Sequence, residues 1–380
     1  MMPKRRDDRD MTYQGFEQGP IRPPSEAHSL LLRVTRNCPW NHCTFCPVYK
    51  GAQFSVRPVA HLLRDIDQVY EAVQRLEEVP RDAALMSPAG LDPRAWAAAR
   101  NWARHGKRRV FLQDANSLVV DPGELAAILQ HLQQRFPEVT RITSYARSNS
   151  IANLAPDALA ALRQAGLSRI HIGMESGADE VLKGVCKGTT QRMHILAGLK
   201  VKDAGMELSE YYMPGLGGRG RLEVNAVETA AALNQINPDF IRLRTLAIPP
   251  GTPLYEDYVA GRFDKATDVE MARELLLFLE SLSGITSVIK SDHILNLLPE
   301  VDGQLPQDRE RLVGIVRAFL EMDPEQQFLY RVGRRMGVLS GLKDLADADR
   351  MARVEEIVQD YRLRPEDVDA VTDDLMRRFI

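Results

Sequence analysis

Short β-rich segments alternate with longer helical segments along most of this sequence, and this alternation constrains the fold more than any other feature. Apolar residues in the helical segments recur every three or four positions, which indicates helices with one buried face. The β-rich segments are residues 29–35, 110–112, 141–144, 169–174, 207–213 and 240–248. Six β-then-α units in a row predict a parallel sheet with right-handed crossovers. The pattern fits a partly open barrel or a doubly wound sheet, and both are α/β folds.

Helices are expected between and after these strands. Pro122 stands at a typical first-turn position, and Gly166 and Gly205 directly follow helical segments, where glycine commonly ends a helix. The expected helices are residues 59–77, 96–102, 122–135, 156–165, 191–204 and 223–234. Beyond Lys265 we expect a mainly helical chain with one further strand candidate at residues 285–289.

These patterns divide the chain into four expected regions. They are a flexible tail over residues 1–25, a β/α core over 26–264, a helical extension packed on the core over 265–338, and a small helical region over 339–380. The first ten residues are mostly charged and lack the apolar stretch of a secretory signal. A chain of 380 residues is long enough for one large domain and a small appendage.

Charge and hydropathy disfavour two classes of partner. The formal net charge is −3, without the basic excess that nucleic-acid-binding surfaces usually need, so we do not expect a nucleic-acid partner. No run of 18 apolar residues occurs, so no membrane span is predicted. We therefore expect a small-molecule substrate.

Three of the four cysteines lie on one loop after the first expected strand, at Cys38, Cys43 and Cys46. With this C-x4-C-x2-C spacing, three thiolates can hold three irons of a [4Fe–4S] cubane and leave the fourth iron open. A zinc site with His42, or a cluster used only for electron transfer, is the alternative interpretation. We expect the distant Cys186 to be a buried small apolar residue. Clustered cysteines of this kind indicate a reducing cytoplasm.

With Phe45 directly before the last cysteine, the loop and its six-unit context resemble the radical S-adenosylmethionine (SAM) superfamily. That superfamily most often has C-x3-C-x2-C after the first strand of a partial barrel, so this loop carries one extra residue. The resemblance covers residues 29–255 and is closest to the coproporphyrinogen-oxidase-like and tRNA-methylthiotransferase-like branches and to iron–sulfur oxidoreductases. It implies a partial (β/α)6 TIM-like barrel with a helical C-terminal region, a [4Fe–4S] cluster on the three cysteines, and SAM.

The resemblance also implies the reaction. An external electron donor of the flavodoxin or ferredoxin type would reduce the cluster, and reductive cleavage of SAM would give a 5′-deoxyadenosyl radical that abstracts hydrogen from the substrate. An RNA-modifying enzyme of the same superfamily and a non-catalytic iron–sulfur or zinc protein are the alternatives. The many acidic residues of 339–380 argue against the RNA-modifying enzyme.

Residues at two strand ends are candidates for holding the methionine part of SAM. Gln113 and Asp114 stand where the superfamily usually has Gly-Gly-Glu, or they form a loop that caps the helix at Pro122. Glu175 matches a glutamine that contacts the SAM amino group in the coproporphyrinogen-oxidase-like branch. Lys187, twelve residues on, matches a basic residue for the SAM carboxylate. The plainer interpretations are a helix cap for Glu175 and a solvated lysine for Lys187.

Later strand ends supply the remaining candidates. Ser209 or Glu210 would contact the ribose, depending on which faces inward, and the chain at Ile248 would lie against the adenine, as the resemblance implies. The arginines Arg147, Arg242 and Arg244 would bind an anionic substrate, or else form internal salt bridges to Glu175 or Glu210. Asp292 and His293 would form an acid–base pair or serve structure only.

Overall fold

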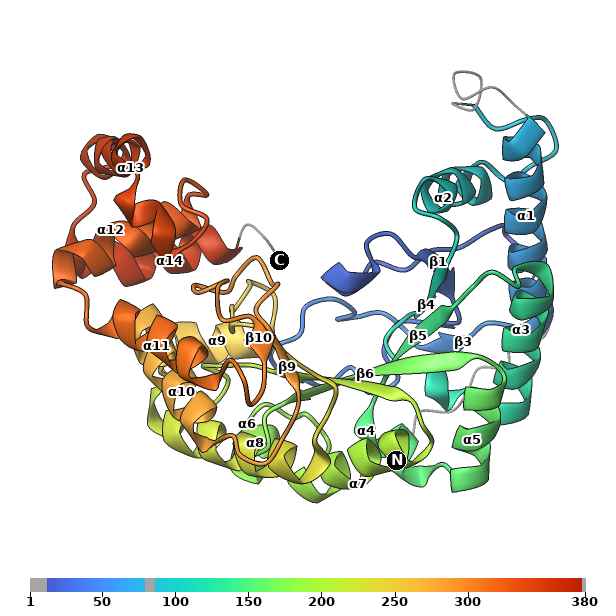
Figure 1. Cartoon of the computed structure of the whole chain (residues 1–380), viewed down its shortest axis with the longest axis horizontal. Coiled ribbons are helices and arrows are strands. Elements are labelled where there is room, and N and C mark those ends of the chain that lie inside the picture. Colours follow the sequence, from blue (N-terminus) through green and yellow to red (C-terminus); the bar gives the residue numbers. More distant parts are fainter. Residues whose placement is uncertain (1–11, 79–85, 378–380) are drawn as a thin grey trace. The chain divides into compact units, whose positions relative to one another are not determined.

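The computed structural model describes residues 12–78 and 86–377 (Figure 1). The chain forms two compact units. The first contains residues 1–41, 48–172 and 196–208, and the second contains residues 42–47, 173–195 and 209–380. Each unit holds part of a mostly parallel sheet with helices, so the predicted α/β fold is confirmed.

In the first unit, β1 (Leu30–Arg33), β4 (Arg109–Gln113), β5 (Arg141–Ala146) and β6 (Leu167–Glu175) are neighbours in that order and run parallel; the end of β6, from Gly173 on, belongs to the second unit. Its helices are α1 (Val59–Glu78), α2 (Pro93–Arg104), α3 (Pro122–Arg135), α4 (Ser148–Asn153) and α5 (Pro156–Gln164). Helices α1, α2, α3 and α5 lie together along one side of these strands (Figure 1). The core between them is apolar, with Leu32, Ile66 and Leu129 fully buried.

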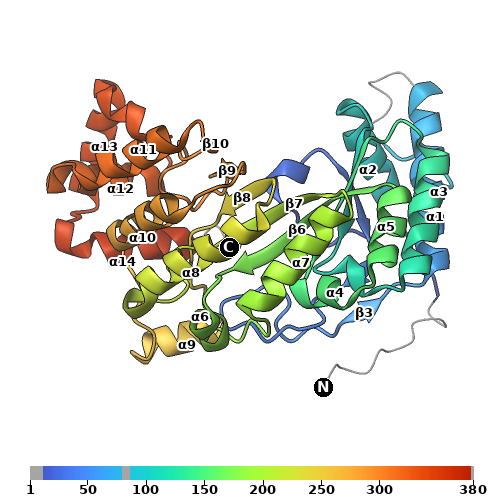
Figure 2. The same cartoon turned by 60° about the horizontal axis from the view of Figure 1, so that its bottom comes forward.

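In the second unit, β7 (Glu207–Tyr212), β8 (Phe240–Leu243) and β9 (Val288–Lys290) run parallel, and β10 (Gly303–Gln304) pairs antiparallel with β9. Its helices are α6 (Asp179–Gly184), α8 (Leu222–Ile236), α9 (Pro253–Val259), α10 (Asp268–Ser281), α11 (Arg309–Leu320), α12 (Pro324–Arg335), α13 (Ala348–Asp360) and α14 (Val368–Arg377). The chain after β8 is thus mainly helical, as predicted, and its last helices gather together in both views (Figure 1, Figure 2). Helix α7 (Gln191–Asp203) has residues in both units.

Two strand boundaries differ from the prediction for local reasons. Strand β1 ends at Arg33, and the next residues form β2 (Thr35–Arg36), which pairs with β3 (Ser55–Val56) instead of continuing in the main sheet. Strand β8 ends at Leu243, because the N–H of Thr245 donates to the Asn296 side chain at 3.0 Å and leaves the ladder. The expected helix at residues 122–135 is confirmed, beginning at Pro122 and ending at Arg135.

The expected flexible tail does not extend to residue 25. Phe16 is fully buried, the Tyr13 hydroxyl donates to Asp65 at 2.6 Å, and the N–H of Gly19 donates to the Gln113 side chain at 2.8 Å. The charged run that suggested a tail covers only the first ten residues, and residues 1–11 lie outside the described part. The segment after that run carries aromatic residues that pack on the first unit. None of the described helices combines the length and apolar character needed to cross a membrane.

Candidate functional site

The first half of the cysteine loop, in the first unit, is shaped by two asparagines. Asn37 and Asn41 have positive φ angles of 66° and 50°, a backbone region that asparagine tolerates better than most residues. The Asn41 side chain donates to the carbonyl of Tyr49 at 2.5 Å, and that of Asn37 donates to the carbonyl of Gln53 at the same distance. These contacts hold the turn that carries the half-buried Cys38.

Asp114 and Gln113 support this half of the loop. The carboxylate of Asp114 is buried and accepts from the Arg33 guanidinium at 2.8 and 2.9 Å, from the N–H of Asn37 at 3.3 Å and from the Tyr49 hydroxyl. Gln113 binds the N-terminal segment through Gly19 and the carbonyl of Ile21. Asp121, not this loop, supplies the side-chain cap of α3. Both predicted cofactor residues therefore have protein partners.

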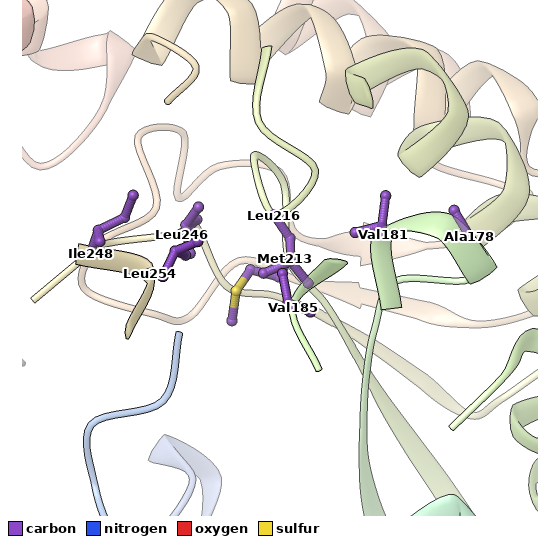
Figure 3. Close-up of a cluster of buried hydrophobic side chains, with 8 residues drawn as sticks. All are labelled: Ala178, Val181, Val185, Met213, Leu216, Leu246, Ile248 and Leu254. Atoms are coloured by element: carbon purple, nitrogen blue, oxygen red, sulfur yellow. The ribbon is translucent and has the colours of Figure 1, made fainter. Parts of the chain in front are cut away.

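The second half of the cysteine loop belongs to the second unit. The N–H of Thr44 donates to the carbonyl of Val185 at 3.0 Å, and the N–H of Leu254 donates to the carbonyl of Thr44 at 3.1 Å. Cys43 is buried and Cys46 half-buried. Phe45 packs against a buried apolar cluster, shown in Figure 3. Its members are Ala178, Val181, Val185, Met213, Leu216, Leu246, Ile248 and Leu254.

Cys38 lies in the first unit, and Cys43 and Cys46 lie in the second. Within residues 12–78 and 86–377, no three His, Cys, Asp or Glu side chains are gathered closely enough to hold a metal ion. Cys186 was predicted to be buried, and this is wrong: it is exposed, with φ 52°, in the turn after α6, and Val185 takes the buried position beside it.

Glu175 and Lys187 meet at the end of β6. The Lys187 Nζ lies 3.2 Å from Oε1 of Glu175, and the two side chains are only 11% and 12% exposed. The same Nζ lies 5.7 Å from the centre of the Phe45 ring. Lys187 is therefore not a solvated lysine. Glu175 does not cap α6, because the N-cap of that helix is Ala178 and no side chain makes a capping hydrogen bond there.

The second oxygen of Glu175, Oε2, is buried and has no hydrogen-bond partner among the described residues. The backbone makes room for this pair, since a Cβ on Gly173 would lie 2.4 Å from Oε1 of Glu175. Glu175 itself has a positive φ of 66°. A buried carboxylate oxygen without a donor is costly, and such atoms often mark a ligand position.

Glu210 and Ser209 alternate on β7. Neither carboxylate oxygen of Glu210 has a hydrogen-bond partner in the described part of the chain. Burial, and next the charge of Glu175, raise the pKa of Glu210 well above its usual value. The Ser209 hydroxyl accepts from Nε of Arg242 at 3.2 Å. Ser209 therefore interacts with Arg242, whereas the Glu210 carboxyl is buried near the charge of Glu175.

The three arginines are in different surroundings. Arg242 forms an ion pair with Asp292, not with the Glu175 or Glu210 that sequence suggested. Arg147, in the first unit, lies over the Trp40 ring with its Cζ 5.2 Å from the ring centre. The guanidinium of the half-buried Arg244 has no ion pair or hydrogen bond among residues 12–78 and 86–377.

His293 and Asp292 do not form a pair with each other. Asp292 is the partner of Arg242. Burial, and next the positive charge of Arg244, lower the pKa of His293 to about 4, so this imidazole is neutral at pH 7. Of the other candidates, Ile248 is 2% exposed within the apolar cluster (Figure 3), which places its side chain in packing.

Glu274 was missed at the sequence level. It is 2% exposed on α10 and accepts hydrogen bonds from Tyr212, Gly215 and Asn225. Burial raises its pKa to about 7. Its position in the helix was a usable signal, because Glu274 stands between Met271 and Phe278 on the buried side.

The comparisons with known proteins agree with the cysteine loop and the β/α order. The family model of the radical SAM superfamily matches residues 32–227, which is just over half of the 380 residues. A tRNA uridine(34) acetyltransferase from Methanocaldococcus infernus is 23% identical over 270 residues, covering 64% of this chain and 47% of that protein. A biotin synthase from Nitratidesulfovibrio vulgaris is 28% identical over 116 residues, covering 30% and 31%.

Among solved structures, coproporphyrinogen III oxidase from Escherichia coli matches with a TM-score of 0.43 and 15% identity, over 66% of this chain and 52% of that one. This chain spans less than half the length of both curated relatives. The family model covers the loop with Cys38, Cys43 and Cys46 and the strand end with Glu175 and Lys187. The chain is therefore an enzyme of the radical SAM superfamily, whose members use a [4Fe–4S] cluster and SAM.

Proposed function

We propose that Cys38, Cys43 and Cys46 hold the [4Fe–4S] cluster and that Glu175 and Lys187 hold the methionine part of SAM. The observation that carries this proposal is the buried Glu175–Lys187 pair with one carboxylate oxygen left without a donor. An ammonium group suits that oxygen, and a carboxylate suits Lys187, since charge-assisted hydrogen bonds are the strong ones. Phe45 lies against Lys187 and ties the second half of the cysteine loop to the pair.

The remaining residues take supporting places in this proposal. Glu210, buried beside Glu175, is the better ribose contact, because the Ser209 hydroxyl already accepts from Arg242. The chain at Ile248 contributes backbone and packing toward the adenine. Asp114 and Gln113 act on the cysteine loop through the partners described above.

A [4Fe–4S] cluster held by Cys38, Cys43 and Cys46, with an external electron donor of the flavodoxin or ferredoxin type, would supply the one-electron reduction of SAM that leads to hydrogen abstraction from the substrate. The residues of this chain orient the cofactor and exclude water. Glu175 and Lys187 lie in a site of low exposure, where their charges act more strongly than in water.

The substrate proposed is a small anion. Arg244 carries this part, because its guanidinium has no partner in the described part of the chain while Arg242 is paired with Asp292. A half-buried guanidinium of this kind suits a carboxylate or phosphate. Arg147 is a weaker candidate, since it lies over Trp40.

The test begins with anaerobic reconstitution of the cluster. With dithionite and SAM, the protein should form 5′-deoxyadenosine, measured by chromatography. The Glu175→Ala variant should retain iron but lose SAM affinity by calorimetry. Product formation without any dependence on Glu175 would remove the proposed SAM site and leave only the cluster assignment.

An RNA substrate is the second candidate, because one matched relative is described as a tRNA uridine(34) acetyltransferase. The match covers 47% of that protein, so its activity does not transfer directly. Binding of total tRNA by the reconstituted protein, measured by gel shift at physiological salt, would favour this candidate. Absence of a shift, with Arg244-dependent binding of small anions, would favour the small substrate.

A further inference from the structure

Glu274 accepts hydrogen bonds from residues of the second unit that are not among the proposed ligand contacts. Its Oε1 accepts from the Tyr212 hydroxyl at 2.7 Å and from the Asn225 amide at 2.6 Å. Its Oε2 accepts from the N–H of Gly215 at 2.7 Å. One carboxylate on α10 thus binds the end of β7, the turn after it and helix α8.

The segment that Glu274 holds, residues 212–216, connects the ends of β6 and β8. The N–H of Met213 donates to the carbonyl of Glu175 at 2.9 Å. The N–H of Arg244 donates to the carbonyl of Tyr212, also at 2.9 Å, and the N–H of Leu246 donates to that of Pro214 at 3.1 Å. A shift of this segment would therefore move the backbone that carries Glu175 and the backbone that carries Arg244.

Residues 212–216 are packed tightly against α10. Gly215 has a positive φ of 85°, and a Cβ there would lie 2.6 Å from Sδ of Met271 on α10. The Tyr212 ring stacks on Phe278 of the same helix, with ring centres 4.2 Å apart. Met213 and Leu216 belong to the apolar cluster against which Phe45 packs (Figure 3). The carboxylate is thus the polar part of a tight contact between α10 and the segment.

We propose that Glu274 is a positioning residue that, with Asn225, fixes the ends of β6 and β8 and so places the Glu175 carboxylate and the Arg244 guanidinium. This inference rests on the proposed SAM site at Glu175. Three donors converge on the two oxygens of Glu274, and an amide in its place would offer one acceptor oxygen and direct N–H groups at one of those donors.

The test compares two substitutions of different severity with a matched control. Glu274→Gln keeps one acceptor, and Glu274→Leu keeps the volume without any acceptor. The control is Asn234→Ala, because Asn234 also links α8 to the end of α10, donating to the carbonyl of Ser281 at 3.0 Å, but does not touch residues 212–216. All variants are reconstituted with cluster, and iron content, thermal midpoint and SAM affinity by calorimetry are measured.

The positioning role predicts a graded loss of SAM affinity at full iron content, severalfold for Glu274→Gln and about tenfold or more for Glu274→Leu. Asn234→Ala should lower the thermal midpoint while SAM affinity stays within about twofold. Should Glu274→Leu fail to fold, Glu274→Gln still decides. Unchanged affinity in Glu274→Gln beside a clear loss in Glu175→Ala overturns the positioning role and leaves the SAM site standing. Unchanged affinity in Glu175→Ala overturns the SAM site, and this inference with it.

Discussion

Two buried carboxylate–cation pairs, one in each unit, differ in how far their hydrogen-bonding capacity is filled. In the first unit, both oxygens of Asp114 have donors, from Arg33, Asn37 and Tyr49. In the second unit, Glu175 has Lys187 on one oxygen and no donor on the other among the described residues. The side chains of both pairs are mostly buried, with no more than 17% exposed, so burial alone does not distinguish them.

The difference teaches how to separate supporting residues from ligand-binding residues. When both oxygens of a buried carboxylate accept hydrogen bonds from the protein, those bonds already stabilise the fold. A ligand could bind there only by displacing the donors. A buried carboxylate with one oxygen unsatisfied gains when a ligand supplies the donor. The comparison therefore predicts stability effects for Asp114 and affinity effects for Glu175.

The largest expected effect concerns the cysteine loop itself. Changing Cys38, Cys43 or Cys46 to alanine should abolish the brown colour and reduce bound iron to background, because each thiolate would hold one iron. Iron analysis and the visible absorption spectrum measure this after anaerobic reconstitution.

Cys186→Ala is the control for these cysteine variants, since Cys186 is an exposed turn residue. It should keep full iron content. Equal loss of iron in this variant would mean that the ligand set is wrong.

Asp114→Asn should have the largest effect on folding. The substitution removes the nearest charge partner of the Arg33 guanidinium, which keeps only the longer ion pair with Glu17 at 3.8 Å, and should lower the free energy of unfolding by about 3 kcal/mol. This is the lower end for a buried pair, because the Arg33 side chain keeps 17% exposure. Urea denaturation measures the change. A large loss of SAM affinity at unchanged stability would reverse the assignment of roles between Asp114 and Glu175.

The sequence predicted the parts of this comparison that depend on local pattern. The helix from Pro122 to Arg135 is marked by its proline and its apolar spacing, and the cysteine loop follows β1 as predicted. The candidates Glu175 and Lys187 came from the resemblance to the radical SAM superfamily, and in the structure the two side chains form an ion pair.

The partners of Asp114 and the role of Glu274 could not be predicted in this way. Arg33 and Tyr49 lie 81 and 65 residues from Asp114 in sequence, and Tyr212 lies 62 residues from Glu274. Such contacts depend on strand order and on side-chain direction, neither of which a periodicity records. Cys186 was misplaced for a local reason, since its apolar character does not record that it lies in an exposed turn, where its φ is 52°.

A third buried carboxyl group, that of Glu274, extends the comparison to the pH dependence of stability. Glu274 accepts only from neutral donors, and burial raises its pKa from 4.5 to about 7. Between these values the unfolded chain has lost the proton and the folded protein keeps it, so stability falls as pH rises from about 4.5 to 7. The loss should be on the order of 3 kcal/mol. The difference in unfolding free energy between the wild type and Glu274→Gln, measured from pH 5 to 8, reports it.

Asp268 provides the contrast for this experiment. It is buried on the same helix but faces Arg331 and Arg335, whose charges outweigh burial and hold its pKa at about 2. Its contribution to stability should therefore stay constant over the same pH range. A pH slope that persists in Glu274→Gln would assign the titration to another group.

Glu175→Ala should affect ligand binding more than folding. A charge-assisted hydrogen bond contributes roughly 1.5–3 kcal/mol, so SAM affinity should fall about ten- to a hundredfold. Calorimetry on the reconstituted protein measures this. The thermal midpoint of the ligand-free protein should change less than in Asp114→Asn, because one oxygen of Glu175 is already without a donor.

The smallest effect on folding is expected for Arg244. Arg244 differs from Arg242 as Glu175 differs from Asp114, because the protein supplies more partners for the charged group of the second residue in each pair. Arg242 is buried and paired with Asp292, and its Nε donates to Ser209. Arg244 is half-buried, with no partner for its guanidinium in the described part of the chain. Arg242→Ala should therefore destabilise the protein, while Arg244→Ala should stay within about 0.5 kcal/mol of the wild type. Urea denaturation of both variants measures this difference. A loss of stability in Arg244→Ala equal to that in Arg242→Ala would show that Arg244 serves the fold, and would remove the reason for assigning it to an anionic substrate.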